Sequence, residues 1–106
     1  MEILLGIADE VARMENNLSR MDPGTPGFKQ LDKGVGRMKE YLRMAGLEME
    51  DMLGKPYVEG MTVVASFVPD GDVPPGQFII TRVDQPQISY EGQLIRVAHV
   101  TVGFNM

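Results

Sequence analysis

The residue types that could support catalysis are few in this chain. His99 is the only histidine, and it stands between Ala98 and Val100 in a run of strand-forming residues. A histidine acts as a general base or a metal ligand only when a second polar group lies at close range. No serine, aspartate or glutamate forms a recognisable motif with His99, and there is no second histidine for a metal pair. We therefore interpret His99 as a structural side chain and expect neither catalytic residues nor a metal site.

Two short motifs resemble ligand-binding loops but lack essential parts. The sequence Asp70-Gly71-Asp72 could begin a calcium loop, yet the later ligands and the closing glutamate are missing, which favours a turn. The stretch KGVGRMK, Lys33 to Lys39, places two glycines near lysines, as a phosphate-binding loop does. It lies within a helical pattern rather than after a strand, so we reject a phosphate site. The sequence predicts a protein that is not an enzyme and needs no cofactor.

Composition narrows the class of protein further. The chain has 106 residues, a formal net charge of −5 and no cysteine. The negative charge argues against binding to nucleic acid or to an anionic membrane surface. No apolar run approaches the roughly 20 residues needed to span a bilayer. The lack of cysteine excludes disulfides and thiolate metal sites and suits a cytoplasmic protein.

The first half of the chain carries a helical pattern. From Glu2 to Met21, apolar residues recur at alternating intervals of three and four, which is the spacing of a heptad seam. Two prolines and two glycines in DPGTPG, Asp22 to Gly27, must stop this helix. The same rhythm resumes at Phe28 and continues to Met52. The short turn between the two segments predicts an antiparallel helical hairpin.

A single hairpin cannot cover all of these apolar side chains. A second copy could cover them, which would give a dimeric four-helix bundle, or the seams could pack on the chain's own sheet. The heptad-like spacing favours the homodimer. Its expected interface consists of Leu4, Ile7, Val11, Met14, Leu18, Phe28, Leu31, Val35, Met38 and Leu42.

The second half of the chain changes to a strand pattern. Four segments are rich in β-branched and aromatic residues: Thr62 to Val68, Gln77 to Val83, Gln87 to Tyr90 and Gln93 to Val102. Turn residues separate them, and Pro74 and Pro75 must lie in a connection because neither has an N–H for a ladder. We predict an α+β fold, with an N-terminal antiparallel helical hairpin in residues 1–54 that dimerises. A small, mostly antiparallel, partner-binding β-domain would follow in residues 55–106.

The strand half contains two groups of residues that form a recognisable pair of signatures. Asp72, Pro75 and Gly76 precede an apolar strand, and a glycine-led run ends the chain, with matches at Gly92, Ile95, Arg96, Ala98, Val100, Thr101 and Val102. Together with the preceding hairpin, this order resembles the GrpE family. Those proteins are nucleotide exchange factors of DnaK-type heat-shock chaperones. The resemblance runs from about Leu4 to Val102.

The resemblance implies a homodimeric co-chaperone of protein folding and the stress response. It would bind the ATPase domain of a DnaK-type chaperone and promote release of ADP. The partner-binding side chains implied on the sheet are Arg82, Gln93, Arg96 and Val102. The chain departs from the family at Thr62, at Gln93 and in Asp84 to Tyr90, and the family's long N-terminal helix has no counterpart. A GrpE-like interaction or assembly module without exchange activity is the alternative.

Overall fold

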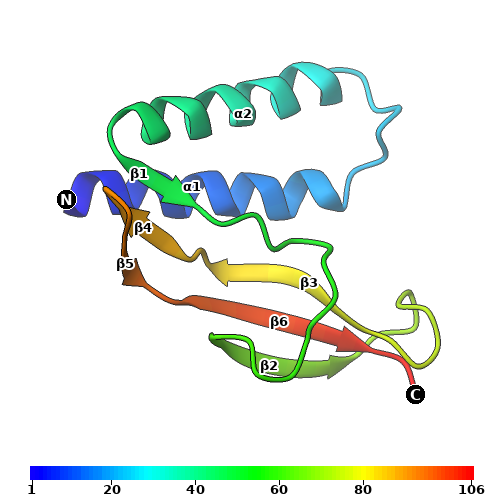
Figure 1. Ribbon diagram of the computed structural model, residues 1–106. Coiled ribbons are helices and arrows are strands. Elements are labelled where there is room, and N and C mark those ends of the chain that lie inside the picture. Colours follow the sequence, from blue (N-terminus) through cyan, green and yellow to red (C-terminus); the bar gives the residue numbers. More distant parts are fainter.

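The computed structural model describes residues 1–106 and contains two helices followed by six strands. The helices α1 (Glu2–Ser19) and α2 (Phe28–Met44) form the expected hairpin. The strands are β1 (Leu47–Met49), β2 (Val63–Pro69), β3 (Phe78–Gln85), β4 (Ile88–Tyr90), β5 (Gln93–Arg96) and β6 (Ala98–Phe104). Figure 1 shows α1 between α2 and the long strands β3 and β6, with β2 on the far side. The predicted α+β fold class is confirmed.

The second helix ends earlier than the sequence pattern suggested. It stops at Met44, and Gly46 then adopts a φ of 91°, a left-handed conformation that favours glycine. A Cβ at this position would also lie 3.3 Å from the Glu91 side chain. The prediction that the helix runs on to Met52 is therefore wrong. Residues 47–49 form β1 instead, which pairs with β4 in antiparallel register.

The strands form two separate three-stranded sheets. Sheet A has the order β1-β4-β5, and sheet B has the order β2-β6-β3. Strand β6 pairs with β3 in antiparallel orientation and with β2 in parallel orientation. The sequence predicted one strand over Gln93 to Val102, but the chain leaves sheet A after Arg96 and enters sheet B at Ala98. Strand β6 is the central strand of sheet B.

The segment around the two prolines is a connection, as expected. Pro74 and Pro75 lie outside every strand, and β3 begins only at Phe78. The Gln77 N–H donates to the Pro74 carbonyl at 3.1 Å, and Gly76 has a φ of 79°. The prolines thus fix a tight turn that delivers the chain to β3.

Two apolar clusters hold the fold together. The first joins both helices to sheet A and contains Ala8, Val11, Leu18, Val35, Leu42, Leu47 and Ile88. The second lies on one face of sheet B, beneath the segment after β1, and contains Met52, Ile80, Val83, Ala98, Val100 and Val102. The hairpin therefore packs on strands of its own chain, which the sequence left open as the alternative to a second copy.

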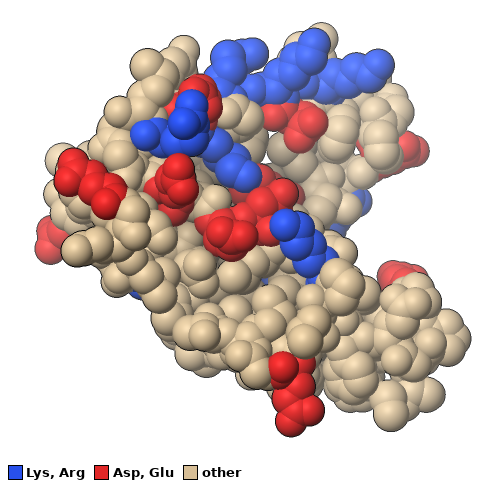
Figure 2. All heavy atoms as spheres, viewed as in Figure 1, with Lys and Arg blue, Asp and Glu red and all other residues tan.

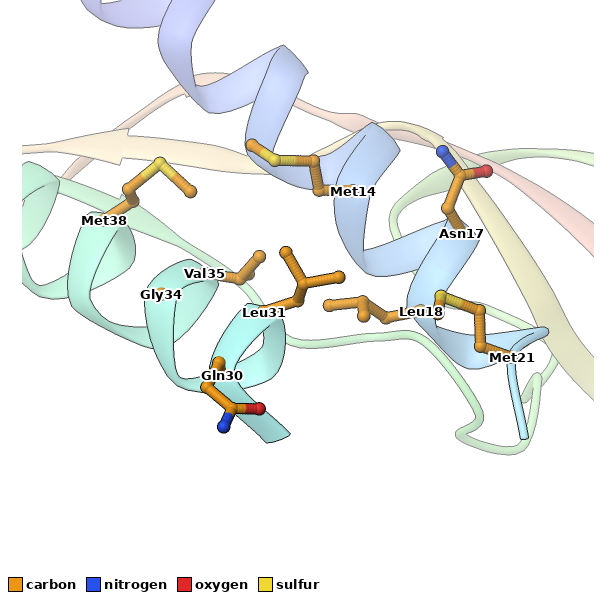
Figure 3. Close-up of a pocket in the computed structure, with 9 residues that line it drawn as sticks. All are labelled: Met14, Asn17, Leu18, Met21, Gln30, Leu31, Gly34, Val35 and Met38. Atoms are coloured by element: carbon orange, nitrogen blue, oxygen red, sulfur yellow. The ribbon is translucent and has the colours of Figure 1, made fainter. Parts of the chain in front are cut away.

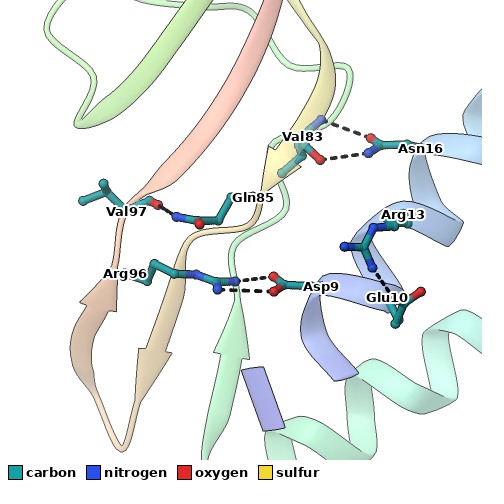
Figure 4. Close-up of polar contacts among 8 residues, drawn as sticks. All are labelled: Asp9, Glu10, Arg13, Asn16, Val83, Gln85, Arg96 and Val97. Atoms are coloured by element: carbon teal, nitrogen blue, oxygen red, sulfur yellow. Dashed lines mark hydrogen bonds and ion pairs between the residues drawn. The ribbon is translucent and has the colours of Figure 1, made fainter. Parts of the chain in front are cut away.

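A buried asparagine joins the hairpin to sheet B (Figure 4). The Asn16 side-chain amide donates to the Val83 carbonyl at 2.8 Å, and the Val83 N–H donates to the Asn16 side-chain oxygen at 3.0 Å. Earlier in the same strand, the Ile80 N–H donates to the Lys55 carbonyl at 2.9 Å. The Asn16 side chain and the Lys55 backbone carbonyl thus provide hydrogen-bond partners for backbone groups of β3 that β6 does not reach. Buried backbone N–H and C=O groups need such partners, because an unpaired polar group is costly away from water.

Candidate protein-interaction surfaces

An apolar groove runs between the two helices. Nine residues line a hollow of about 240 Å³: Met14, Asn17, Leu18, Met21, Gln30, Leu31, Gly34, Val35 and Met38. Figure 3 shows side chains of both helices directed into this space, with the Met14 and Met38 thioethers at one end. Gly34 has no side chain to fill it, and methionine adapts its shape to a partner readily. The groove is suited to an apolar partner surface.

The ten predicted interface residues divide into three groups by burial. Val11, Leu18, Val35 and Leu42 are buried in the core of a single chain. Leu4, Met14, Phe28 and Met38 are half-buried around that core. Ile7 and Leu31 are exposed, at 41% and 55%. A second copy can therefore reach the half-buried and exposed side chains, whereas the first group already packs within the chain.

The four predicted partner-binding residues of the strands have different surroundings. Val102 is completely buried in the core of sheet B and cannot contact a partner, so the prediction for this residue is corrected. It was chosen on a strand whose side chains alternate between core and surface, and the alternation places it inside. Arg82 and Gln93 are exposed.

Arg96 is held by an acid from the helical hairpin (Figure 4). Its guanidinium donates to both carboxylate oxygens of Asp9, at 2.5 and 3.4 Å, and the two side chains are 20% and 33% exposed. The remaining guanidinium nitrogen, Nε, is buried without a partner. Because Asp9 belongs to α1, Arg96 ties sheet A to the hairpin.

The outer face of sheet B carries polar side chains beside the exposed Val64, and they form no catalytic arrangement. His99 is exposed on this face. The Thr101 hydroxyl donates to Asp84 at 2.8 Å, and Arg82 forms an ion pair with the same carboxylate at 2.9 Å. No group of three or more histidine, cysteine, aspartate or glutamate side chains is placed to hold a metal ion.

The two loop-like motifs adopt the structures that the sequence favoured. The Asp72 N–H donates to the Asp70 carboxylate at 2.9 Å, which is the bond of an Asx turn. Lys33 to Lys39 lie within α2. Both motifs are thus local structure.

Comparisons with known proteins did not identify a family or a relative of this chain. A scan against protein-family models gave no match, and no curated protein is significantly similar to this chain. Neither helix has the length and hydropathy that a membrane span requires.

Sequence reasoning missed the polar residues that join the two halves. Asn16 and Asp9 each bond a partner more than 60 positions away, and Lys39 contacts Glu15 on the facing helix at 3.1 Å. One signal was present, because Asn16 stands on the buried side of α1 among apolar residues. A polar residue there needs a partner, but the sequence does not say which one.

One exposed ion pair on α2 shifts the pKa of both members. The Arg43 guanidinium hydrogen-bonds the Glu40 carboxylate and lowers the pKa of that carboxyl, while Glu40 raises the pKa of Arg43. Because the pKa of Glu40 is lower in the folded state, the pair's stabilising contribution is present above the unfolded pKa. It is lost as the pH falls through the folded pKa. Both side chains are largely exposed, at 59% for Arg43 and 52% for Glu40, so this is a minor contribution.

Proposed function

We propose that this protein is a co-chaperone that promotes release of ADP from a DnaK-type chaperone. The observation that carries the proposal is the GrpE-like order of sequence features: a helical hairpin, the Asp72-to-Gly76 turn and the glycine-led run from Gly92. In the structure these are α1 and α2, the turn before β3, and the hairpin turn that leads through β5 into β6. The proposed activity is non-covalent binding to the chaperone, and no covalent bond is made or broken.

Such a factor works through a difference in affinity. If it binds the opened, nucleotide-free form of an ATPase domain more tightly than the ADP-bound form, it shifts the domain toward the opened form. Linkage then requires that ADP is bound less tightly in the complex by the same factor. No catalytic residue is needed for this effect.

The groove between α1 and α2 supports a homodimer of the hairpin. Leu31 is exposed at its edge, and Met14 and Met38 line it half-buried. Two such hairpins packed groove to groove would cover these side chains in a four-helix bundle with two-fold symmetry. The dimer would present two copies of the β-domain to the chaperone.

On the β-domain, the exposed side chains Arg82 and Gln93 are the candidates for chaperone contact. Arg82 belongs to β3 and Gln93 begins β5. Arg96 can contribute to the chaperone contact only while it also maintains its ion pair with Asp9. This contact is therefore smaller than the one the sequence implied, since Val102 is excluded.

Release of a fluorescent ADP analogue from a DnaK-type ATPase domain tests the proposal. The unmodified protein should accelerate release in stopped-flow measurements, and Arg82→Ala with Gln93→Ala should reduce that acceleration. A loss of about 1.4 kcal/mol of contact energy corresponds to a tenfold reduction. Lys55→Ala, an exposed cation in the segment before β2, is the matched control and should leave the rate unchanged. No acceleration by the unmodified protein would contradict the exchange activity.

The second candidate is an assembly module that has the same architecture without exchange activity. It is favoured by the internal engagement of Val102 and Arg96, two of the four side chains implied as chaperone contacts. A dimer that neither binds the ATPase domain nor speeds ADP release would support this alternative.

A further inference from the structure

The outer face of α2 carries cations that the chain does not neutralise. Five ion pairs engage Arg13, Lys39, Arg43, Arg82 and Arg96. Lys29, Lys33 and Arg37 are exposed, form no ion pair and follow one another at intervals of four along α2. We call these three residues the cationic ridge. Figure 2 shows Lys and Arg side chains gathered along α2, on the side away from the sheets.

The nearby acids Asp32 and Glu40 form no ion pair with this ridge. Asp32 lines a separate hollow with Glu15 and Phe28. Glu40 accepts two hydrogen bonds from the Arg43 guanidinium. The three positive charges are therefore available to a partner, on a chain whose net charge is −5.

The position of the cations opposes helix stability. Lys29 lies in the first turn of α2, which contains no acidic residue, and the N-cap Gly27 provides no side-chain hydrogen bond. Cations at a helix N-terminus face the positive end of the macrodipole, and like charges four residues apart repel each other. A helix selected only for stability would place acids here. Such a local conflict is typical of a functional surface.

Exposed interface-type residues continue the same face. Tyr41, four residues after Arg37, is 64% exposed, and Met44 is 73% exposed. Tyrosine, methionine and arginine are enriched where proteins contact one another, and lysine is not. The face thus combines charges that can select a partner with apolar side chains that can anchor it.

We propose that the cationic ridge binds an acidic helical segment of another protein, with Tyr41 and Met44 as apolar anchors. A four-residue interval on a helix advances by about 6 Å, so the ridge repeats at that distance. A facing helix with glutamates at four-residue intervals has the same repeat and can pair with all three cations. The surface lies on α2, apart from the strands, and the proposal does not depend on the exchange activity.

Two other polyanions fit the surface less well. Over the roughly 12 Å between Lys29 and Arg37, duplex DNA presents about seven phosphates, because its charges are about 1.7 Å apart. The excess phosphates would meet the acidic remainder of the chain. A membrane-surface helix needs a broad apolar face toward the lipid, and the buried residues Val35 and Leu42 of α2 pack inward.

The test uses the full chain and three probes. The first is a capped synthetic helical peptide with glutamates at every fourth position and a leucine one turn beyond the last. The others are a single-stranded thymidine oligonucleotide and vesicles of phosphatidylglycerol and phosphatidylcholine. Binding of each is measured by fluorescence anisotropy at low and physiological salt, and the peptide-binding amides are located by NMR.

The test variant carries Lys29→Gln, Lys33→Gln and Arg37→Gln. The control carries Arg13→Gln, Arg20→Gln and Lys55→Gln, which removes the same charge from exposed cations elsewhere. Glutamine is a good helix former, so α2 should persist in both proteins, as circular dichroism will show. We expect the test variant to weaken peptide binding at least tenfold and the control less than twofold, with shifted amides confined to residues 28–45.

Several outcomes would overturn the proposal. These are no peptide binding by the unmodified chain, equal losses in the two variants, or shifted amides outside α2. Equal binding of a peptide with the same composition but scrambled glutamate spacing would reject the matched repeat. Tighter, ridge-dependent binding of the oligonucleotide or the vesicles would assign the surface to nucleic acid or lipid instead.

Discussion

The hairpin and sheet B differ in how far they bury their apolar side chains within a single chain. In sheet B, the central strand β6 buries Ala98, Val100 and Val102, while the alternate residues His99 and Thr101 are exposed and partly exposed. In the hairpin, the seam is divided: Val11 and Val35 are buried, while Ile7 and Leu31 are exposed. The core face of β6 therefore closes within one chain, whereas the hairpin retains an apolar groove. The outer strands of sheet B also expose apolar side chains, with Val64, Phe67 and Phe78 exposed at 53%, 48% and 37%. We expect self-association from the hairpin and partner contact from the edges of the sheets. The exposed residues of these edges include the polar Arg82 and Gln93 and the apolar Phe67 and Leu94.

The largest expected effect comes from a charge inside sheet B. Val102→Asp would place a carboxylate among Ile80, Val100 and the other side chains of a closed core. Because a buried charge without a partner is among the most costly changes, we expect a loss of at least about 4 kcal/mol in the free energy of unfolding. Chemical denaturation measures this value.

The control for this variant is His99→Asp, three positions earlier on β6 and on its exposed face. It introduces the same group on the same strand and should change the unfolding free energy by less than about 0.5 kcal/mol. Equal effects of the two changes would mean that β6 does not separate a core face from a surface face.

A smaller but still large effect is expected at the junction of the two regions. Asn16→Ala removes both bonds to Val83 and leaves a buried N–H and a buried carbonyl without partners. With each of the two unsatisfied groups costing about 1–3 kcal/mol, the loss should be about 2–6 kcal/mol. Asn17→Ala, at an exposed neighbouring position, should cost little. A negligible effect of Asn16→Ala in urea denaturation would show that the junction does not contribute to stability.

The third prediction tests the groove of the hairpin. Leu31→Gln should leave the monomer's stability almost unchanged because Leu31 is exposed in the single chain. If two grooves face each other, the change should weaken the dimer by about 2 kcal/mol, or roughly 30-fold in dissociation constant. Sedimentation equilibrium measures this constant.

Ile95→Gln, an exposed apolar position on β5, is the matched control and should not alter the dissociation constant. If the unmodified chain remains monomeric at all concentrations, the proposal of a dimer formed through the hairpin is contradicted.

Sequence patterns predicted the regular parts of this structure and missed the long-range ones. Apolar residues repeat every three or four positions in a helix and every second position in a strand, because these intervals follow from local backbone geometry. These spacings located the hairpin and most of the strands. They could not show that Gly46 ends α2 early, since Ala45, Met49 and Met52 also fit the three-four spacing of a continued helix. Periodicity fits both structures over so short a segment.

The candidate site was less predictable because burial depends on tertiary pairing. Val102 and Arg96 were selected from a sequence signature, which does not indicate the face on which each side chain lies. The register of β6 between β2 and β3 places Val102 in the core, and the packing of α1 brings Asp9 to Arg96. Arg82 is exposed although Ile80 and Val83 of the same strand are buried, and it pairs with the partly exposed Thr101 rather than with a core residue of β6. Gln93 is exposed at the start of the edge strand β5.

The smallest effect is expected for the ion pair between Arg96 and Asp9. Both members are partly exposed, so a double-mutant cycle with Arg96→Ala and Asp9→Ala should give a coupling of about 1 kcal/mol. If Arg96 serves only to join sheet A to the hairpin, the two single variants should leave chaperone binding equally unaffected. A loss of binding for Arg96→Ala alone would return Arg96 to the contact surface.

The affinity of the protein for a DnaK-type ATPase domain, measured by calorimetry with and without ADP, tests the central claim most directly. Exchange by differential binding requires tighter binding to the nucleotide-free domain, and a tenfold difference corresponds to about 1.4 kcal/mol of coupling. We predict at least this difference. Equal affinity for the two forms would contradict the account, because a ligand that binds both states equally cannot drive ADP release.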